Sequence, residues 1–242
     1  MRAIHFTYGQ KKMNYNKCIC VIPARGGSKR IKNKNIKKIF GKYLIQIVIE
    51  TAVKSKIFDE IYVSTDSKNI KKIAEKHGAK VSQLRNKKLS NDTAGTDAVL
   101  NDFVMSNNIS AKYIACLYPT AILIEYRDLK KAYKKFIKDN SDCLLSIGKY
   151  LNNPLRSLEL DNKNYIKFVS NKNIKKNSQE LKDLFYDCGS FYFYKTKVLK
   201  SIKKIVFPKK TTGFLLHPQK SIDINYPEDL NMAKILYKSN VL

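Results

Sequence analysis

The chain has 242 residues, of which 43% are hydrophobic, so it is long enough and apolar enough to bury the core of one α/β domain. This composition excludes a disordered chain. No apolar run approaches the roughly 18 residues of a membrane-spanning helix, and the N-terminus lacks a compact apolar stretch after its charges. The sequence therefore predicts a cytoplasmic protein with no membrane partner.

The charge is strongly basic, because 47 Lys and Arg residues stand against 20 Asp and Glu, which gives +27. Taken alone, this balance favours nucleic acid as a partner. The lysines are spread along the chain, however, and Asn, Ile and Tyr are abundant as well, which is typical of compositional drift at exposed positions. We interpret most of the charge as a solvated surface that suits an anionic substrate, and predict no nucleic-acid partner.

Arginine is rare, with six of the 47 basic residues. Lysine substitutes poorly where a planar, bidentate donor must meet phosphate or carboxylate. Arg2 lies in a predicted tail and Arg127 beside a predicted helix start, where a surface role is favoured. The other four are candidates for anion binding: Arg25, Arg30, Arg85 and Arg156.

The polar residues 1–16 are predicted to form a tail, and residues 17–242 a single domain. Strands are predicted, in chain order, at 18–23, 60–64, 80–84, 113–117, 143–147 and 191–194. Helices are predicted at 44–55, from 66 or 67 to 77, and at 96–106, 128–138 and 227–237. This alternation predicts an α/β fold whose mostly parallel sheet has helices on both faces.

Residues 149–185 interrupt this alternation. They are polar, rich in Asn and Lys, and contain only short apolar pieces. We interpret them as an inserted element that serves in dimerisation or as a lid. The five cysteines form no C-x-x-C pair, and most lie in or beside strand-like stretches. Buried free thiols are therefore favoured over a zinc site or disulfides.

A basic loop with two glycines follows the first predicted strand. It reads PARGGSKR at 23–30, and Lys34 and Asn35 come shortly after. Glycines let backbone N–H groups approach phosphate oxygens closely, and ligands of open α/β sheets bind beyond the carboxyl ends of strands. The loop matches neither a dinucleotide fingerprint nor a Walker loop. On this run alone, a phosphate-binding loop and a solvated basic loop are equally supported.

A second candidate segment reads SIDIN at 221–225. With the period of a strand, its isoleucines face the core, while Asp223 and Asn225 emerge together on the other side. Mg²⁺ takes only one or two carboxylates in addition to phosphates and water, so this pair is adequate for a magnesium site. The alternative for Asn225 is a cap of the following helix.

These motifs form a larger set. The set consists of IPARGGS at 22–28 with Lys34 and Asn35, VSTD at 63–66, LR at 84–85, LSNDT at 89–93, LYPT at 117–120 and SIDIN at 221–225. In this order, and across nearly the whole chain, it resembles the CMP-sialic acid synthetase (acylneuraminate cytidylyltransferase) family. The resemblance implies a Rossmann-like sheet of nucleotidyltransferase type, CTP as co-substrate, Mg²⁺ as cofactor and a homodimer.

The resemblance also implies roles for individual residues. Arg25, Lys29 and Asp223 are the implied catalytic residues, and no general base is identified. The implied nucleotide site consists of Arg25, Gly27, Ser28, Lys29, Lys34, Asn35, Arg85, Ala94 and Thr96. The implied metal ligands are Asp223 and Asn225, although many relatives carry a second aspartate in place of Asn225.

The implied sugar site comprises Tyr118, Arg156 and Asp187, with a surface role as the alternative for Arg156. Tyr118 replaces a glutamine of sialate enzymes, and the runs AGTDAV at 94–99 and FYDCGSFY at 185–192 resemble the pseudaminate branch. Asn177 and Ile122 depart from that branch, which has an arginine and a proline there. The predicted acceptor is therefore pseudaminic acid, with N-acetylneuraminate, legionaminate or an octulosonate as alternatives.

The predicted reaction is attack by the anomeric oxygen of an acidic nine-carbon sugar on the α-phosphate of CTP, which releases pyrophosphate. Arg25 and Lys29 are expected to support the leaving group. Two other classes stay open. A basic nucleic-acid-binding protein would bind with a steep salt dependence and without CTP turnover. An inactive sugar-nucleotide-binding protein would bind CTP without releasing pyrophosphate.

Overall fold

The computed structural model describes residues 17–91, 94–201 and 207–241, so the predicted tail at 1–16 lies outside the described residues. Its main sheet has the strand order β10-β6-β9-β5-β1-β4. These strands are β1 (Cys18–Pro23), β4 (Glu60–Ser64), β5 (Tyr113–Leu117), β6 (Cys143–Lys149), β9 (Phe185–Lys195) and β10 (Thr211–Leu215). The pairs β1–β4, β1–β5 and β6–β10 are parallel, whereas β9 is antiparallel to both of its neighbours. The predicted mostly parallel sheet is confirmed.

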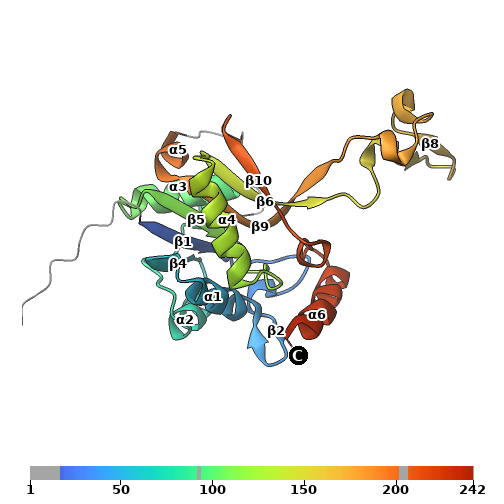
Figure 1. Cartoon of the computed structure of the whole chain (residues 1–242). Helices are drawn as coiled ribbons and strands as arrows, with labels where there is room; N and C mark the ends of the chain where they lie inside the picture. Colours follow the sequence, from blue (N-terminus) through green and yellow to red (C-terminus); the bar gives the residue numbers. More distant parts are fainter. Residues whose placement is uncertain (1–16, 92–93, 202–206, 242) are drawn as a thin grey trace, which may run out of the picture.

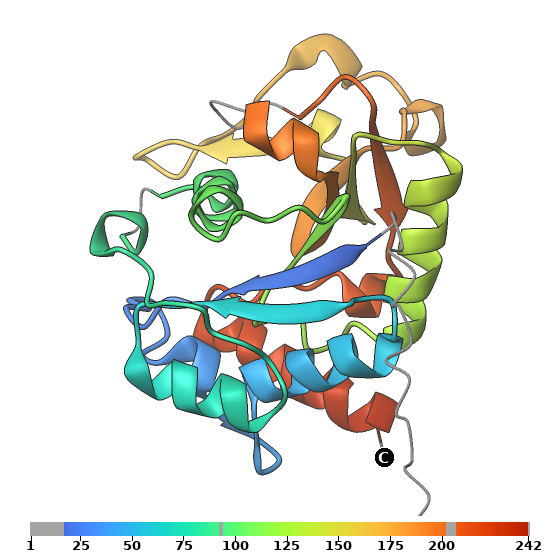
Figure 2. The same ribbon diagram turned by 90° about the vertical axis from the view of Figure 1, so that its left-hand side faces the viewer.

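Helices cover both faces of this sheet, as the sequence predicts (Figure 2). One face carries α1 (Leu44–Ser55), α2 (Lys68–Lys76), α4 (Tyr126–Lys138) and α6 (Pro227–Val241). The other face carries α3 (Thr96–Ser106) and α5 (Thr196–Ser201). Alternate residues of β1 supply the two cores: Cys18, Cys20 and Ile22 pack on the first face, and Ile19 and Val21 on the second. A strand that is apolar at every position is thereby buried on both sides.

Three predicted strands need correction. The segment 80–84 forms only an isolated bridge, in which Lys80 pairs with Tyr62 of β4. The segment 221–225 belongs to no strand, and its Ser221 (φ −96°, ψ 18°) ends the preceding 3-10 helix (Pro218–Lys220). The predicted strand 191–194 is the end of the much longer β9. The sequence prediction also missed β10, α5 and the small hairpin of β2 (Lys38–Ile39) and β3 (Lys42–Tyr43).

Residues 149–185, which we call the arm, leave the sheet at the end of β6 and return at the start of β9. Figure 1 shows the arm, in yellow and orange, projecting away from the sheet. It contains a hairpin of β7 (Leu158–Leu160) and β8 (Ile166–Phe168). Several of its apolar side chains are more than half exposed: Leu151, Leu158, Leu160, Tyr165, Ile166 and Val169. In the described residues, the arm therefore lacks a core of its own.

All five cysteines are buried and free, which confirms the prediction from their spacing. None of the helices in the described ranges is long and apolar enough to cross a membrane.

Candidate active site

The basic loop lies at the carboxyl end of β1, where contacts to the neighbouring strand β4 hold it. The Gly26 N–H donates to Asp66 Oδ1 at 2.8 Å. A Cβ atom on Gly26 would lie 3.2 Å from the Cβ of Ser67, so a glycine is needed for this close approach. The side chain of Asn35 donates to the Arg25 carbonyl oxygen at 2.9 Å and closes the loop from its other end. The loop is thus fixed by its own chain.

Next to this loop lies a cavity of about 220 Å³. Its walls come from segments that follow the carboxyl ends of the parallel strands β1, β4 and β5, the usual position of a ligand site in this type of sheet. Ten of the predicted site residues line it: Arg25, Ser28, Lys29, Lys34, Asn35, Arg85, Ala94, Thr96, Tyr118 and Asn225. The four that do not are Gly27, Asp223, Arg156 and Asp187.

The rarity of arginine in the sequence correctly indicated residues of this cavity. Of the four candidate arginines, Arg25, Arg30 and Arg85 line it, although the predicted site set omitted Arg30. Arg85 is only 9% exposed, and its Nε donates to Ser90 Oγ at 3.1 Å. Burial lowers the pKa of its guanidinium, and Asp66 acts in the opposite direction. Because arginine stays charged in spite of such shifts, the cavity contains a fixed cation.

Tyr118 forms the polar link between the cavity and β9. Its hydroxyl is hydrogen-bonded to Thr96 Oγ1, and its ring lies 5.9 Å from that of Tyr192. Burial raises the pKa of the Tyr118 phenol, so the group is neutral at physiological pH. Tyr192 donates from its hydroxyl to Asp187 Oδ2 at 2.6 Å, and Asp187 Oδ1 accepts from the Gly189 N–H at 2.9 Å. Asp187 therefore braces β9, and its contact with a sugar stays a prediction.

Asp223 lies in the segment 221–225, next to the basic loop. Lys34 donates to the adjacent Ile224 carbonyl oxygen at 2.6 Å. A Cβ atom on Gly189 of β9, whose φ is +56°, would lie 3.7 Å from the Asp223 carboxylate. Partial desolvation raises the pKa of the Asp223 carboxyl, whereas the hydrogen bond from Asn225 and the charge of Lys34 act to lower it. The segment that carries Asp223 therefore contacts the region of the basic loop, through Lys34.

The alternation predicted for this segment is correct, although its strand is not. Ile224 is 1% exposed, and Asp223 and Asn225 meet on the other side. Side chains take the place of a neighbouring strand as partners of the backbone, because Lys34 binds the Ile224 carbonyl and Tyr186 binds that of Ser221.

The Asp223 carboxylate is a suitable ligand for Mg²⁺, whereas the polar atoms of the Asn225 side chain already have partners. The Asn225 amide donates to Asp223 Oδ2, and its Oδ1 accepts from Arg30 Nη2 at 2.8 Å. The described residues contain no group of three or more His, Cys, Asp or Glu side chains that could hold a metal ion. An exposed carboxylate that shares Mg²⁺ with phosphates and water needs no such group. A direct contact of Asn225 with the metal stays a prediction.

Two predicted residues lie elsewhere. Gly27 is exposed in the basic loop, and a Cβ atom there would meet nothing within 4 Å. Arg156 is exposed on the arm, at the end of a short 3-10 helix (Pro154–Arg156). Within one chain, Arg156 is therefore not part of the cavity wall.

Asp66 is the main residue that the site prediction missed. It was noticed in the VSTD run but received no role. Its contact with Gly26 spans 40 residues of sequence, so local patterns could not reveal it. Its position directly after a strand was the available signal.

Comparison with known proteins decides the family. The sequence profile of the family described as Cytidylyltransferase matches residues 19–242. The chain belongs to the cytidylyltransferase family. This cytidylyltransferase is accordingly an enzyme of the nucleotidyltransferase class, as predicted.

Individual relatives agree with this assignment. The chain is 39% identical over 227 residues to "Pseudaminic acid cytidylyltransferase" of Campylobacter jejuni, with 93% of this chain and 97% of that protein covered. It is 28% identical to "N-acylneuraminate cytidylyltransferase" of Streptococcus agalactiae, over 88% of this chain and 51% of that protein. A solved structure of CMP:2-keto-3-deoxy-manno-octonic acid synthetase complexed with CTP superimposes with a TM-score of 0.69 at 19% identity, covering 93% of this chain and all of that one. This last likeness confirms the predicted nucleotidyltransferase fold.

Proposed function

We propose that this cytidylyltransferase transfers CMP from CTP to the anomeric oxygen of a nonulosonic acid, and that the acceptor is pseudaminic acid. The observation that carries the proposal is the cavity beside the basic loop, where three of the six arginines converge with Ser28, Lys29 and the neighbouring Asp223 segment. The relative with 39% identity is named for pseudaminic acid, which supports this sugar over the alternatives.

The triphosphate is assigned to the basic loop and its neighbours. Arg25 and Lys29 bring positive charge to the cavity wall, and Ser28 brings a hydroxyl. Asn35, Arg85, Ala94 and Thr96 lie further along the same wall, where we assign the nucleoside. Tyr118 lies between this wall and Asp187, and is assigned to the sugar.

In the proposed reaction, the anomeric oxygen attacks the α-phosphorus of CTP. A bond forms between this oxygen and phosphorus, and the bond from the α-phosphorus to the oxygen that bridges to the β-phosphate breaks. Pyrophosphate leaves, and the proton of the anomeric hydroxyl passes to solvent. Mg²⁺ held by Asp223 and phosphate oxygens would neutralise charge that develops on the phosphates. Arg25 and Lys29 would stabilise the departing pyrophosphate.

We propose further that residues 17–242 form one nucleotidyltransferase domain and that the arm joins two copies into a homodimer. An exposed hairpin with Leu158, Leu160, Tyr165 and Ile166 is an unfavourable surface for an isolated chain, and a second copy would bury it. A dimer would also give Arg156 a second cavity to approach, because it does not line that of its own chain. The five free buried thiols support a cytoplasmic location, where thiols stay reduced.

A pyrophosphate-release assay with CTP and Mg²⁺ tests this function. The acceptors are pseudaminic acid, legionaminic acid, N-acetylneuraminic acid and an octulosonic acid, each also tested without enzyme. We expect the highest kcat/KM with pseudaminic acid. Faster turnover of another acid would overturn the sugar assignment alone. No release with any acid, while CTP still raises the melting temperature, would indicate an inactive sugar-nucleotide-binding protein.

A further inference from the structure

Resting on the proposed function, we propose that Tyr186 is a positioning residue, which couples the base of the arm to the segment that carries Asp223. Tyr186 is the second residue of β9, directly after the chain returns from the arm. Its hydroxyl lies 2.9 Å from Ser221 Oγ and 3.4 Å from the Ser221 carbonyl oxygen. Ser221 Oγ itself donates to the Pro218 carbonyl oxygen, so Tyr186 is the donor to Ser221 Oγ.

The ring of Tyr186 is fixed from the side of the arm. Tyr186 pairs with Gly148 of β6, and a Cβ atom on Gly148 would lie 2.5 Å from the ring. The ring therefore occupies the space that any other residue at 148 would need. Tyr150, at the beginning of the arm, meets it edge to face with ring centroids 5.0 Å apart. The two ends of the arm thus meet at this one aromatic ring.

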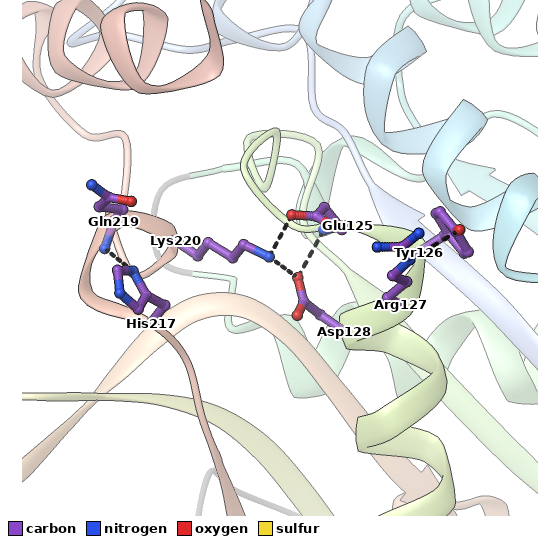
Figure 3. Close-up of polar contacts among 7 residues, drawn as sticks. All are labelled: Glu125, Tyr126, Arg127, Asp128, His217, Gln219 and Lys220. Carbon is purple, nitrogen blue, oxygen red and sulfur yellow. Dashed lines mark hydrogen bonds and ion pairs between the residues drawn. The ribbon is translucent and has the colours of Figure 1, made fainter. Parts of the chain in front are cut away.

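Besides the contact of Arg30 with Asn225, three anchors hold the Asp223 segment, and the hydroxyl of Tyr186 is one of them. Lys34 holds the far side through the Ile224 carbonyl oxygen. On the near side, Lys220 lies 2.7 Å from Glu125 and 2.8 Å from Asp128 at the start of α4 (Figure 3). Both of these anchors come from the body of the protein. Tyr186 alone of the three joins the segment to the arm.

The coupling has a physical consequence for Asp223. Ser221 is 4% exposed and precedes Asp223 by only two residues, so a shift of Ser221 displaces the carboxylate. A contact that moves the arm, such as a second copy of the chain, would act through Tyr186 on the geometry of Asp223. The residues assigned to the nucleoside lie on other segments and would be unaffected.

Tyr186→Phe tests the inference, because it removes the hydroxyl and keeps the ring. In the metal-free protein, we expect faster amide hydrogen exchange at 217–226 and unchanged exchange in β1 and α1. In the assay, kcat should fall about tenfold, the Mg²⁺ concentration for half-maximal rate should rise, and the KM for CTP should stay within about twofold. Tyr150→Phe, which keeps its edge contact with Tyr186, is the matched control and should resemble the wild type.

Ser221→Ala removes the same hydrogen bond from the other side. Ser221→Ala also removes the hydrogen bond from Ser221 Oγ to the Pro218 carbonyl oxygen, so the double variant should lose no more activity than Ser221→Ala alone. Wild-type exchange at 217–226 together with wild-type kcat in Tyr186→Phe would overturn the inference. So would a change of exchange spread over the whole sheet, which would mean a merely structural role. Failure of the wild-type enzyme to release pyrophosphate would contradict the proposed function instead. The hydrogen-exchange data would still test whether Tyr186 couples the arm to the Asp223 segment.

Discussion

The cavity and the arm share one lysine-rich chain but are organised in opposite ways. Around the cavity, polar groups are held by partners distant in sequence, such as Gly26 by Asp66 and Lys34 by the Ile224 carbonyl. On the arm, many polar contacts are local, as in the turn where Asp161 accepts from the Lys163 and Tyr165 backbones. Apolar side chains are correspondingly buried around the cavity and exposed on the arm.

This difference indicates that one chain completes the cavity by itself, whereas the arm needs a partner. Preorganised charges act without reorganisation when a ligand binds. An exposed apolar hairpin, in contrast, gains most by association. Changes at the cavity should therefore alter catalysis at a constant oligomeric state, whereas changes at the arm should alter the oligomeric state while CTP still binds.

The largest effect is expected for Asp223→Ala. Loss of the only carboxylate that we assign to Mg²⁺ should lower kcat about 10³-fold. The melting temperature should stay near that of the wild type, because Asp223 is exposed. Steady-state pyrophosphate release at saturating CTP measures the loss.

Asp183→Ala is the matched control for that experiment. Asp183 is a carboxylate at the base of the arm, where it pairs with Lys149 at 2.7 Å in an exposed position. Its loss should leave kcat unchanged. Near-normal turnover of Asp223→Ala would remove Asp223 from the mechanism.

Changes on the arm should weaken the dimer while CTP still binds. Replacing both Tyr165 and Ile166 with serine removes two apolar side chains that are 71% and 65% exposed. If a second copy covers them, the dimer dissociation constant should rise at least about tenfold, while CTP still protects the protein against heat. Light scattering over a concentration series measures the first quantity.

Met105→Ser, on α3 of the body, is the control for this pair. Met105 is 57% exposed, so its loss alters surface hydrophobicity to a similar degree without touching the arm. An arm variant with wild-type molar mass at every concentration would contradict the proposed dimer.

The sequence predicted best those features that local patterns determine. The bounds of β1, α1, β4, α3 and β5 agree with the structure, because continuous apolar runs and helical spacing continue to the ends of these elements. The rarity of arginine located much of the cavity wall without any contact information. Both signals depend on residue type and spacing alone.

Features that depend on distant contacts escaped prediction. β10 was missed because its sequence TTGFL has no clear alternation, and its Gly213 is required by Ile147 of β6, which would lie 2.5 Å from a Cβ atom. The segment 221–225 has the period of a strand, but side chains of Lys34 and Tyr186 bind its carbonyls. No local pattern distinguishes these cases from a true strand.

The two loop glycines offer a smaller test within the cavity. Gly26→Ala should destabilise the protein by about 1 kcal/mol, because the new Cβ atom presses on Ser67. Gly27→Ala meets nothing and should change stability by less than about 0.5 kcal/mol. If the triphosphate lies over Gly27, the same methyl group should weaken CTP binding about tenfold. Chemical denaturation and calorimetric titration with CTP give the two values, and equal CTP affinity of Gly27→Ala and the wild type would place the triphosphate elsewhere.

The smallest expected effect concerns the stability that ion pairs contribute, and it is tested with one pair beside the Asp223 segment and one on the arm. Lys220 is 18% exposed between Glu125 and Asp128, whereas Lys167 is 70% exposed beside Glu159 on the arm. Lys220→Met should cost about 1 kcal/mol of unfolding free energy at pH 7, and Lys167→Met less, because water and salt screen the exposed pair.

The pH dependence should separate these two lysines as well. Burial acts to lower the pKa of Lys220, but hydrogen bonds to Asp128 and Glu125 outweigh it, so the pKa is raised above its usual value. Its contribution to stability should therefore be complete below the ordinary lysine pKa of about 10.4, and disappear as the pH rises through the raised value. Urea denaturation of both variants and the wild type at pH 7, and again at a pH above the raised pKa of Lys220, measures this. At pH 7, Lys220→Met should lower the free energy of unfolding more than Lys167→Met does. An equal or smaller decrease would mean that the partly buried ion pair of Lys220 stabilises the protein no more than the exposed pair on the arm.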